Sequence, residues 1–248
     1  MKLILTHLFL FLFINQLHSS TYFQQKVDYK IQVTLNDATH ELRGFEEITY
    51  TNNSPTPLQE LYFHLYPNAY KNTSTTLAKE LYNVGAEYML EAEEKDFGFI
   101  DSLDFKTGTK KLEWQLLQDT IDICKIKLAE PLLPGASITI STPFKVKIPS
   151  AVLSRLGHNE QAYFITQWYP KPAVYDKNGW NYFSYLDKGE YYSEFGSFDV
   201  TITLPANYVV GATGELINGE SENTWLEEKS KETMGLADFP TDMSFPVS

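Results

Sequence analysis

Cysteine is nearly absent from this sequence. Cys124 is the only one, so no disulfide can form within the chain. It alternates with Ile126 and Leu128 in a run with an apolar residue at every second position. That pattern is typical of a small buried side chain, and it gives no support to a reactive thiol.

Motifs that hold metals or activate nucleophiles are also missing. Beyond residue 20, histidine occurs only at His40, His64 and His158. These are too widely separated for an H-E-x-x-H motif, and no cysteine pair is present. The sequence contains no G-x-S-x-G motif and no phosphate-binding glycine loop. We therefore predict no catalytic residue and no metal ligand in this chain, and we interpret His64 as a sheet residue.

Positive charge is scarce. Lys and Arg number 20 against 32 Asp and Glu, which gives a formal net charge of −12. A polyphosphate would be repelled by such a chain, because binding of nucleic acid depends on neutralising its phosphates. The composition therefore predicts no nucleic-acid partner.

Long apolar runs are absent too. The longest covers residues 3–14, well short of the roughly 20 apolar residues that span a membrane. Lys2 precedes it, and the small residues Ser19 and Ser20 follow. Residues 1–20 therefore predict a cleavable signal peptide, and with it an exported protein, periplasmic or extracellular, without a stable membrane span. An N-terminal anchor that stays attached is the alternative.

Alternation of apolar and polar residues dominates the rest of the chain. It is clear over residues 27–35, 61–66, 137–148 and 198–204. One-sided alternation predicts antiparallel sheets with one buried face. We therefore predict an all-β fold, a sandwich of stacked antiparallel sheets. Pro143 within the third of these runs predicts a sheet edge or a bulge.

Two segments depart from this rhythm. Residues 77–95 place apolar side chains at steps of three and four, which predicts one inserted amphipathic helix that covers a surface. Residues 219–248 contain a charged run followed by a stretch punctuated by prolines. We interpret them as a terminal strand and a linker toward another domain, which leaves residues 21–218 as the β domain.

The segment from Tyr163 to Phe195 is unusually rich in aromatic residues. Each large ring can bury roughly 150–250 Å², which is more apolar surface than one strand needs. Prolines and glycines break any long regular element there. The segment is either an aromatic β core or a surface for docking or substrate, and both readings remain open.

Four stretches, in this order and spacing, resemble one protein family. They are L-R-G-F-E-E-I-T-Y-T-N-N-S from Leu42, L-Y-F-H-L-Y-P-N-A-Y from Leu61, F-I-T-Q-W-Y-P-K-P-A-V-Y-D from Phe164, and E-F-G-S-F-D-V-T-I-T-L-P-A-N-Y-V-V-G-A-T-G-E-L from Glu194. Together, over about 200 residues, they are similar to the N-terminal β domain of the aminopeptidase N family of zinc metallopeptidases, the gluzincin aminopeptidases, and most of all to its bacterial secreted branch.

The resemblance implies a saddle-like β domain that packs on a catalytic domain, roofs its substrate groove and takes peptide substrates. Zinc and the catalytic motifs would belong to that second domain, and none of those motifs occurs in this sequence. The chain then corresponds to a non-catalytic N-terminal domain of a secreted metallo-aminopeptidase, without a cofactor of its own.

The same resemblance points to two substrate-binding candidates. Thr166-Gln167-Trp168-Tyr169 matches a family loop whose last position normally binds the free α-amine of the substrate. Gln167 matches the first glutamine of that loop, whereas the amine-binding position holds Tyr169. A phenol can accept a hydrogen bond from an ammonium but lacks a carboxylate's charge. Both residues could instead be ordinary sheet residues.

A different class of function fits the composition as well. An exported β-sandwich that holds a peptide or a glycan on exposed aromatic rings would show the same aromatic segment. Such a module should be monomeric and stable, whereas a β domain without its neighbour should expose a large apolar patch.

Overall fold

The computed structural model describes residues 22–159, 162–189 and 191–236. These residues fall into two compact units, of which the first ends at Ile202 and the second begins at Thr203. The predicted signal peptide, residues 1–20, and the last part of the predicted linker lie outside the described residues. In the described part of the chain no helix is long and apolar enough to cross a membrane.

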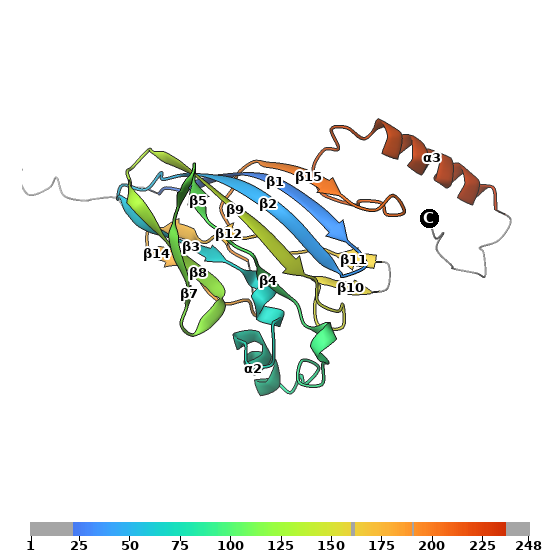
Figure 1. Cartoon of the computed structure of the whole chain (residues 1–248), viewed down its shortest axis with the longest axis horizontal. Coiled ribbons are helices and arrows are strands. Elements are labelled where there is room, and N and C mark those ends of the chain that lie inside the picture. The colour runs from blue at the N-terminus through green and yellow to red at the C-terminus, as the bar shows by residue number, and fades with distance from the viewer. Residues whose placement is uncertain (1–21, 160–161, 190, 237–248) are drawn as a thin grey trace, which may run out of the picture. The chain divides into compact units, whose positions relative to one another are not determined.

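The larger sheet of the first unit has the strand order β15-β1-β2-β9-β5-β6, with β4 also paired to β9. Its strands are β1 (Lys26–Asn36), β2 (Glu41–Thr51), β4 (Phe99–Asp101), β5 (Lys106–Thr107), β6 (Lys110–Lys111), β9 (Ser137–Lys147) and β15 (Phe198–Thr203). The pairs β1–β2 and β2–β9 are antiparallel over eleven residues each without a change of register. Figure 1 shows these long strands side by side.

The smaller sheet has the strand order β12-β3-β8-β7. Its strands are β3 (Leu58–His64), β7 (Glu113–Leu117), β8 (Thr120–Leu132) and β12 (Lys171–Pro172), and two short hairpins accompany it, β10 (Gly157–Asn159) with β11 (Ala162–Phe164) and β13 (Val174–Asp176) with β14 (Gly179–Asn181). The pairs within this sheet are antiparallel as well. The two-residue strand β12 forms one edge of it, and Pro172 occupies its second position.

One large apolar core lies between the two sheets. Ile31 and Ile48 from the larger sheet and Phe63 and Ile126 from the smaller one belong to the same buried cluster. On β1, the two residues that flank Ile31 in sequence are exposed, which is the pattern that the sequence predicts. The predicted fold class, stacked antiparallel sheets with mainly β structure, is confirmed.

The second half of strand β3 is covered on both faces, which one-sided alternation did not predict. Leu61 and Phe63 face the large core, and Tyr62 and His64 on the other side are buried too. Tyr62 packs with Ala173 in a small separate cluster against which Trp180 lies. The aromatic segment therefore supplies the cover of this second face.

Pro143 lies inside β9 without a bulge against β2, since it is paired in register with Phe45. On the other side of β9, strand β5 pairs at Ser141 and strand β4 pairs from Lys145 onward. Pro143 therefore lies between these two pairings, where the missing N–H is tolerated. The prediction of an edge is met locally, and the prediction of a bulge against β2 is wrong.

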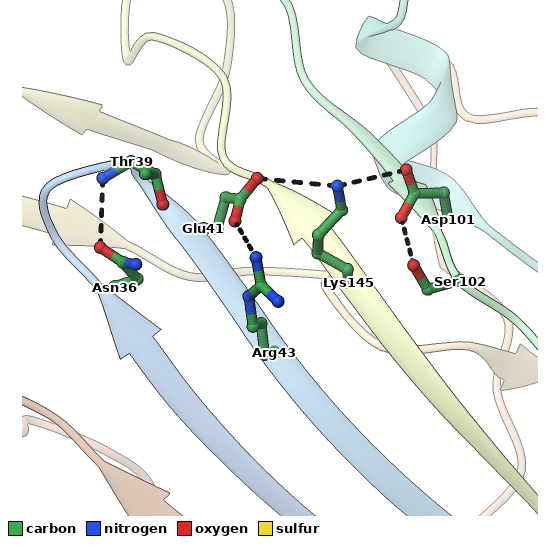
Figure 2. A network of polar contacts seen from close by, with 7 residues as sticks. All are labelled: Asn36, Thr39, Glu41, Arg43, Asp101, Ser102 and Lys145. Carbon is green, nitrogen blue, oxygen red and sulfur yellow. Dashed lines mark hydrogen bonds and ion pairs between the residues drawn. The ribbon is translucent and has the colours of Figure 1, made fainter.

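Charged side chains link three strands at one end of the larger sheet (Figure 2). Lys145 of β9 lies 3.6 Å from Glu41 of β2 and 3.5 Å from Asp101 of β4. Arg43 forms a second ion pair with Glu41 at 3.1 Å. Partly exposed ion pairs of this kind contribute only about 0–1 kcal/mol each. Their contribution to the stability of the sheet is therefore small.

The inserted helix is shorter than the predicted residues 77–95. Helix α2 covers Thr76–Asn83, and its first turn is capped by Thr75, whose hydroxyl accepts a hydrogen bond from the amide of Ala78. Gly85, with φ of 79°, follows the helix end, as is typical of a helix C-terminus. The 3-10 turns η1 (Tyr66–Tyr70) and η2 (Glu94–Asp96) flank this region. The predicted surface cover is confirmed for α2, which buries Leu77, Ala78 and Leu81.

The second unit contains helix α3 (Glu220–Met234), in which no side chain is buried. A terminal strand was expected in this region, and for these residues that expectation is wrong. The run is rich in Glu and Lys, which favour helix over strand. Lys229 also pairs with Glu232 one turn later, at 2.7 Å.

Candidate functional site

The candidate residue Gln167 lies in a bend between β11 and β12, not on a strand. Its φ of 51° places it in the left-handed region, which residues other than glycine rarely occupy. This conformation breaks the strand alternation that would have made Gln167 and Tyr169 neighbours on one face. Left-handed backbone at a non-glycine residue is concentrated at functional sites.

The side chain of Gln167 accepts a hydrogen bond from a buried lysine. Lys171 Nζ lies 2.9 Å from Gln167 Oε1 and 2.9 Å from Ser193 Oγ. Lys171 is only 5% exposed, whereas Ser193 is exposed. The ammonium thus contacts one side chain in a bend and one side chain of an exposed residue.

Two tyrosine rings also lie near this ammonium. Nζ of Lys171 lies 5.1 Å from the ring centroid of Tyr66 and 5.8 Å from that of Tyr191. At such distances the negative face of an aromatic ring attracts a cation. We call Lys171, Gln167, Ser193, Tyr66 and Tyr191 the Lys171 cluster.

Burial lowers the pKa of Lys171 to about 8, because a low-dielectric environment disfavours the charged form. None of the ion pairs in the described part of the chain includes Lys171. His64 lies beside Tyr66, with ring centroids 4.5 Å apart. Burial, and then the charge of Lys171, lower the pKa of His64 to about 3, so this imidazole is neutral at physiological pH.

The surrounding structure fixes the cluster from several sides. Lys171 pairs with His64 across β12 and β3. Asp122 accepts hydrogen bonds from Ser184 Oγ at 3.0 Å and from the amide of Tyr185 at 2.6 Å, which anchors the chain ahead of Tyr191. Burial raises the pKa of Asp122, and these two hydrogen bonds oppose that effect.

Tyr191 is also held from its outer side. Arg155 Nη2 donates to Tyr191 Oη at 2.9 Å. A cavity of about 140 Å³ borders this ring, and Tyr185 and Lys188 line it as well.

Tyr169 lies in a different environment from Gln167. Its ring makes edge contacts with Tyr29 at 5.5 Å and with Phe198 at 6.0 Å, and it packs against the large core. Burial, with Glu46 nearby, raises the pKa of Tyr169. The structure therefore places Gln167 in the polar cluster and Tyr169 among core aromatics.

The described histidines do not fit a zinc site. His40 and His158 stack face to face, with ring centroids 3.7 Å apart and planes 7° apart, so their ring nitrogens do not converge on one ion. His40 Nδ1 lies 2.7 Å from the hydroxyl of Tyr163. Over residues 22–159, 162–189 and 191–236, no three His, Cys, Asp or Glu side chains are grouped to hold a metal.

The aromatic segment divides between core and surface. Trp168, Tyr169, Tyr175 and Trp180 pack on the large core. From Tyr182 to Ile202, a range that includes most of strand β15 after this segment, many large apolar side chains remain exposed. These are Tyr182, Phe183, Leu186, Tyr192, Phe195, Phe198, Val200 and Ile202. The reading as an aromatic core thus holds for the first part of the segment, and a docking or substrate surface stays a prediction for the exposed part.

Sequence reasoning missed Lys171 and Ser193. One signal was present, since Lys171 is the only charged residue between Tyr163 and Tyr175 and has a proline on each side. A charge in such a run must be accommodated by the fold. Ser193 carried no signal, because its role depends on a contact 22 residues away.

No protein-family model matches this sequence, and no curated protein does. Among solved structures, a mutant M1 zinc metallopeptidase from Deinococcus radiodurans bound to a Tyr-Ser-Ala substrate is 14% identical over 79% of this chain and 37% of that chain, with a TM-score of 0.41. A structure of the M1 zinc metallopeptidase from the same organism gives a TM-score of 0.39, also at 14% identity and with the same coverage of both chains.

A two-domain M1 zinc metallopeptidase mutant bound to L-tryptophan gives a TM-score of 0.29 at 14% identity, over 49% of this chain and 20% of that one. The chain thus spans well under half the length of these structures. Likeness this distant carries no argument about what the chain does.

Proposed function

We propose that this chain is the non-catalytic N-terminal β domain of a secreted zinc metallo-aminopeptidase. In this proposal it packs on a catalytic domain carried outside these 248 residues and roofs the groove that holds the peptide. Gln167 or Tyr169 would then lie near the amino-terminal residue of the substrate. The four sequence stretches from Leu42 to Leu216 support the assignment.

The observation that carries the proposal is the apolar surface left open after Asn181. Eight large apolar side chains between Tyr182 and Ile202 are exposed, and Phe195 is 79% exposed. Soluble monomers rarely leave large contiguous apolar patches uncovered. A neighbouring domain that packs on residues 182–202 would remove these eight side chains from water.

The test uses the full chain, expressed and purified without its first 20 residues if they are cleaved. We expect strong binding of an apolar dye, concentration-dependent self-association, no stoichiometric zinc and no cleavage of aminoacyl-anilides. Replacing Phe195 and Phe198 by serine should reduce dye binding. Phe45→Ser is the matched control, because Phe45 is similarly exposed on β2 and should leave dye binding unchanged.

Chelator-sensitive turnover by this chain alone would overturn the proposal. A stable monomer that binds no dye would overturn it as well, because the apolar surface would then need no cover.

A second candidate is a free-standing exported module that binds a peptide or a glycan. The ring of Tyr182 supports it, since it is 43% exposed and stacks flat on Tyr62, with centroids 4.3 Å apart and planes 12° apart. A rigid, half-exposed ring can serve as a platform for such ligands. This reading predicts a stable monomer whose ligand binding is lost in Tyr182→Ala.

A further inference from the structure

We propose that the Lys171 cluster is a binding site for a carboxylate, which Ser193 Oγ and Lys171 Nζ would hold together. The inference stands on the contacts around Lys171 and does not depend on the metallopeptidase assignment.

The first argument is an uncompensated charge. Lys171 is 5% exposed and takes part in no ion pair with a described residue. A buried ammonium without an acidic partner is unfavourable, since two neutral acceptors and two rings replace its water only in part. The pKa of Lys171, lowered by burial to about 8, reflects that deficit. A carboxylate would supply the missing negative charge.

The second argument is the number of hydrogen-bond donors. An ammonium carries three N–H groups, and Lys171 uses two of them on Gln167 Oε1 and Ser193 Oγ. Ser193 Oγ accepts in this contact, so its own O–H remains to donate. Ser193 is exposed, so a ligand from solvent can approach its side chain, and we infer that such a ligand also meets the third N–H of Lys171. Two donors side by side match the two oxygens of a carboxylate.

The third argument is that the cluster disfavours a second cation. The carbonyl oxygen of Gln167, which could accept from an α-ammonium, already accepts from Lys171. Tyr66 and Tyr191 face that same ammonium, and Arg155 lies over the Tyr191 ring at 5.7 Å. An incoming ammonium would meet positive charge, whereas a carboxylate would meet charge of opposite sign.

The experiment follows Lys171 directly in the full chain by NMR of isotopically labelled lysine side chains. The Lys171 signal is identified by its absence in Lys171→Met. Two probes share one apolar group and differ in charge, namely N-acetyl-phenylalanine, a carboxylate, and phenylalaninamide, an ammonium. We expect the carboxylate to shift the Lys171 signal and to raise its pKa by about one unit, equivalent to tenfold tighter binding to the charged lysine. The ammonium should do neither.

Variants and a third probe sharpen the result. Ser193→Ala should weaken carboxylate binding about tenfold, the effect of losing one charge-assisted hydrogen bond, and Lys171→Met should abolish it. Lys177→Met, at an exposed lysine of the same segment, is the matched control and should bind normally. N-acetyl-aspartate N-methylamide tells an acidic side chain from a C-terminal carboxylate, and tighter binding of either probe identifies the source.

Three outcomes would overturn the inference. The first is a wild-type Lys171 signal that no carboxylate probe moves, and the second is stronger binding of phenylalaninamide. The third is a lowered Lys171 pKa in Glu190→Gln, because the chain itself would then provide the counter-ion. None of these outcomes affects dye binding or self-association, so the inference and the proposed function can fail separately.

Discussion

The core between the two sheets buries a carboxyl group and the Lys171 cluster buries an amino group, in opposite ways. Glu46 is 0% exposed, and neither of its carboxyl oxygens has a hydrogen-bond partner among the described residues. Burial raises the pKa of Glu46 well above its ordinary value, which favours the neutral acid. Lys171 is almost as deeply buried, yet it has two acceptors and two rings. The core therefore favours the neutral form of its acid, whereas the ammonium of Lys171, with a pKa lowered to about 8, is still mostly charged at neutral pH.

The largest expected effect comes from cutting into the core. Phe63→Ala should lower the free energy of unfolding by about 4 kcal/mol, because Phe63 is fully buried and packs on Phe105 at 5.3 Å. Phe195→Ala, at a side chain that is 79% exposed, should stay within about 0.5 kcal/mol. Urea denaturation of both variants measures the difference. Equal losses would mean that Phe195 is covered in solution.

Glu46 should make stability depend on pH. In the unfolded chain its carboxyl ionises near the ordinary value of 4.5, whereas in the folded chain the pKa is raised well above it. The folded state therefore binds more protons above pH 4.5, and stability falls as pH rises until the folded pKa is passed. Glu46→Gln cannot ionise at this position. Between pH 4.5 and the folded pKa, its free energy of unfolding should therefore rise relative to that of the wild type by up to about 1.4 kcal/mol per pH unit.

Denaturation curves of the wild type and Glu46→Gln between pH 4 and pH 8 test this. Parallel pH profiles would show that Glu46 is solvated or paired in the folded protein. Glu47→Gln is the control, since Glu47 is an exposed neighbour on the same strand, and its profile should follow the wild type.

A smaller effect is expected where the aromatic segment is anchored near the cluster. Asp122→Asn replaces one of the two acceptors that hold Ser184 and the amide of Tyr185. Losing one buried hydrogen bond should destabilise the chain by about 1–2 kcal/mol. Asp119→Asn, at an exposed aspartate in the turn before β8, should have no measurable effect. Thermal denaturation of both variants measures the difference in stability. An unchanged melting temperature in Asp122→Asn would mean that these hydrogen bonds do not stabilise the chain.

The smallest effect on stability should accompany a clear change in surface behaviour. Phe198→Ser removes a ring that is 52% exposed but stacks on Tyr29 at 4.4 Å. We expect a loss of about 0.5–1 kcal/mol, together with weaker self-association in sedimentation. Unchanged self-association would mean that the chain associates through a surface that does not include Phe198.

Strands were predictable from this sequence because their burial is one-sided. Residues 27–35 alternate strictly, and β1 follows that pattern. Helices were harder, since the apolar steps of residues 77–95 continue past Gly85, whose left-handed conformation follows the end of α2. Of the Lys171 cluster, sequence reasoning singled out Gln167 alone. Lys171 contacts Gln167 because the backbone bends at Gln167, and it contacts Ser193 although 22 residues separate the two in sequence. No local sequence pattern encodes either contact.

The short strand β12 also limits how this molecule can meet another. Pro172 has no N–H to offer, and it occupies one of only two positions at that margin of the smaller sheet. An added strand would find no continuous ladder to extend there. A partner that met this margin of the sheet would therefore have to recognise side chains, because the backbone offers no ladder to extend.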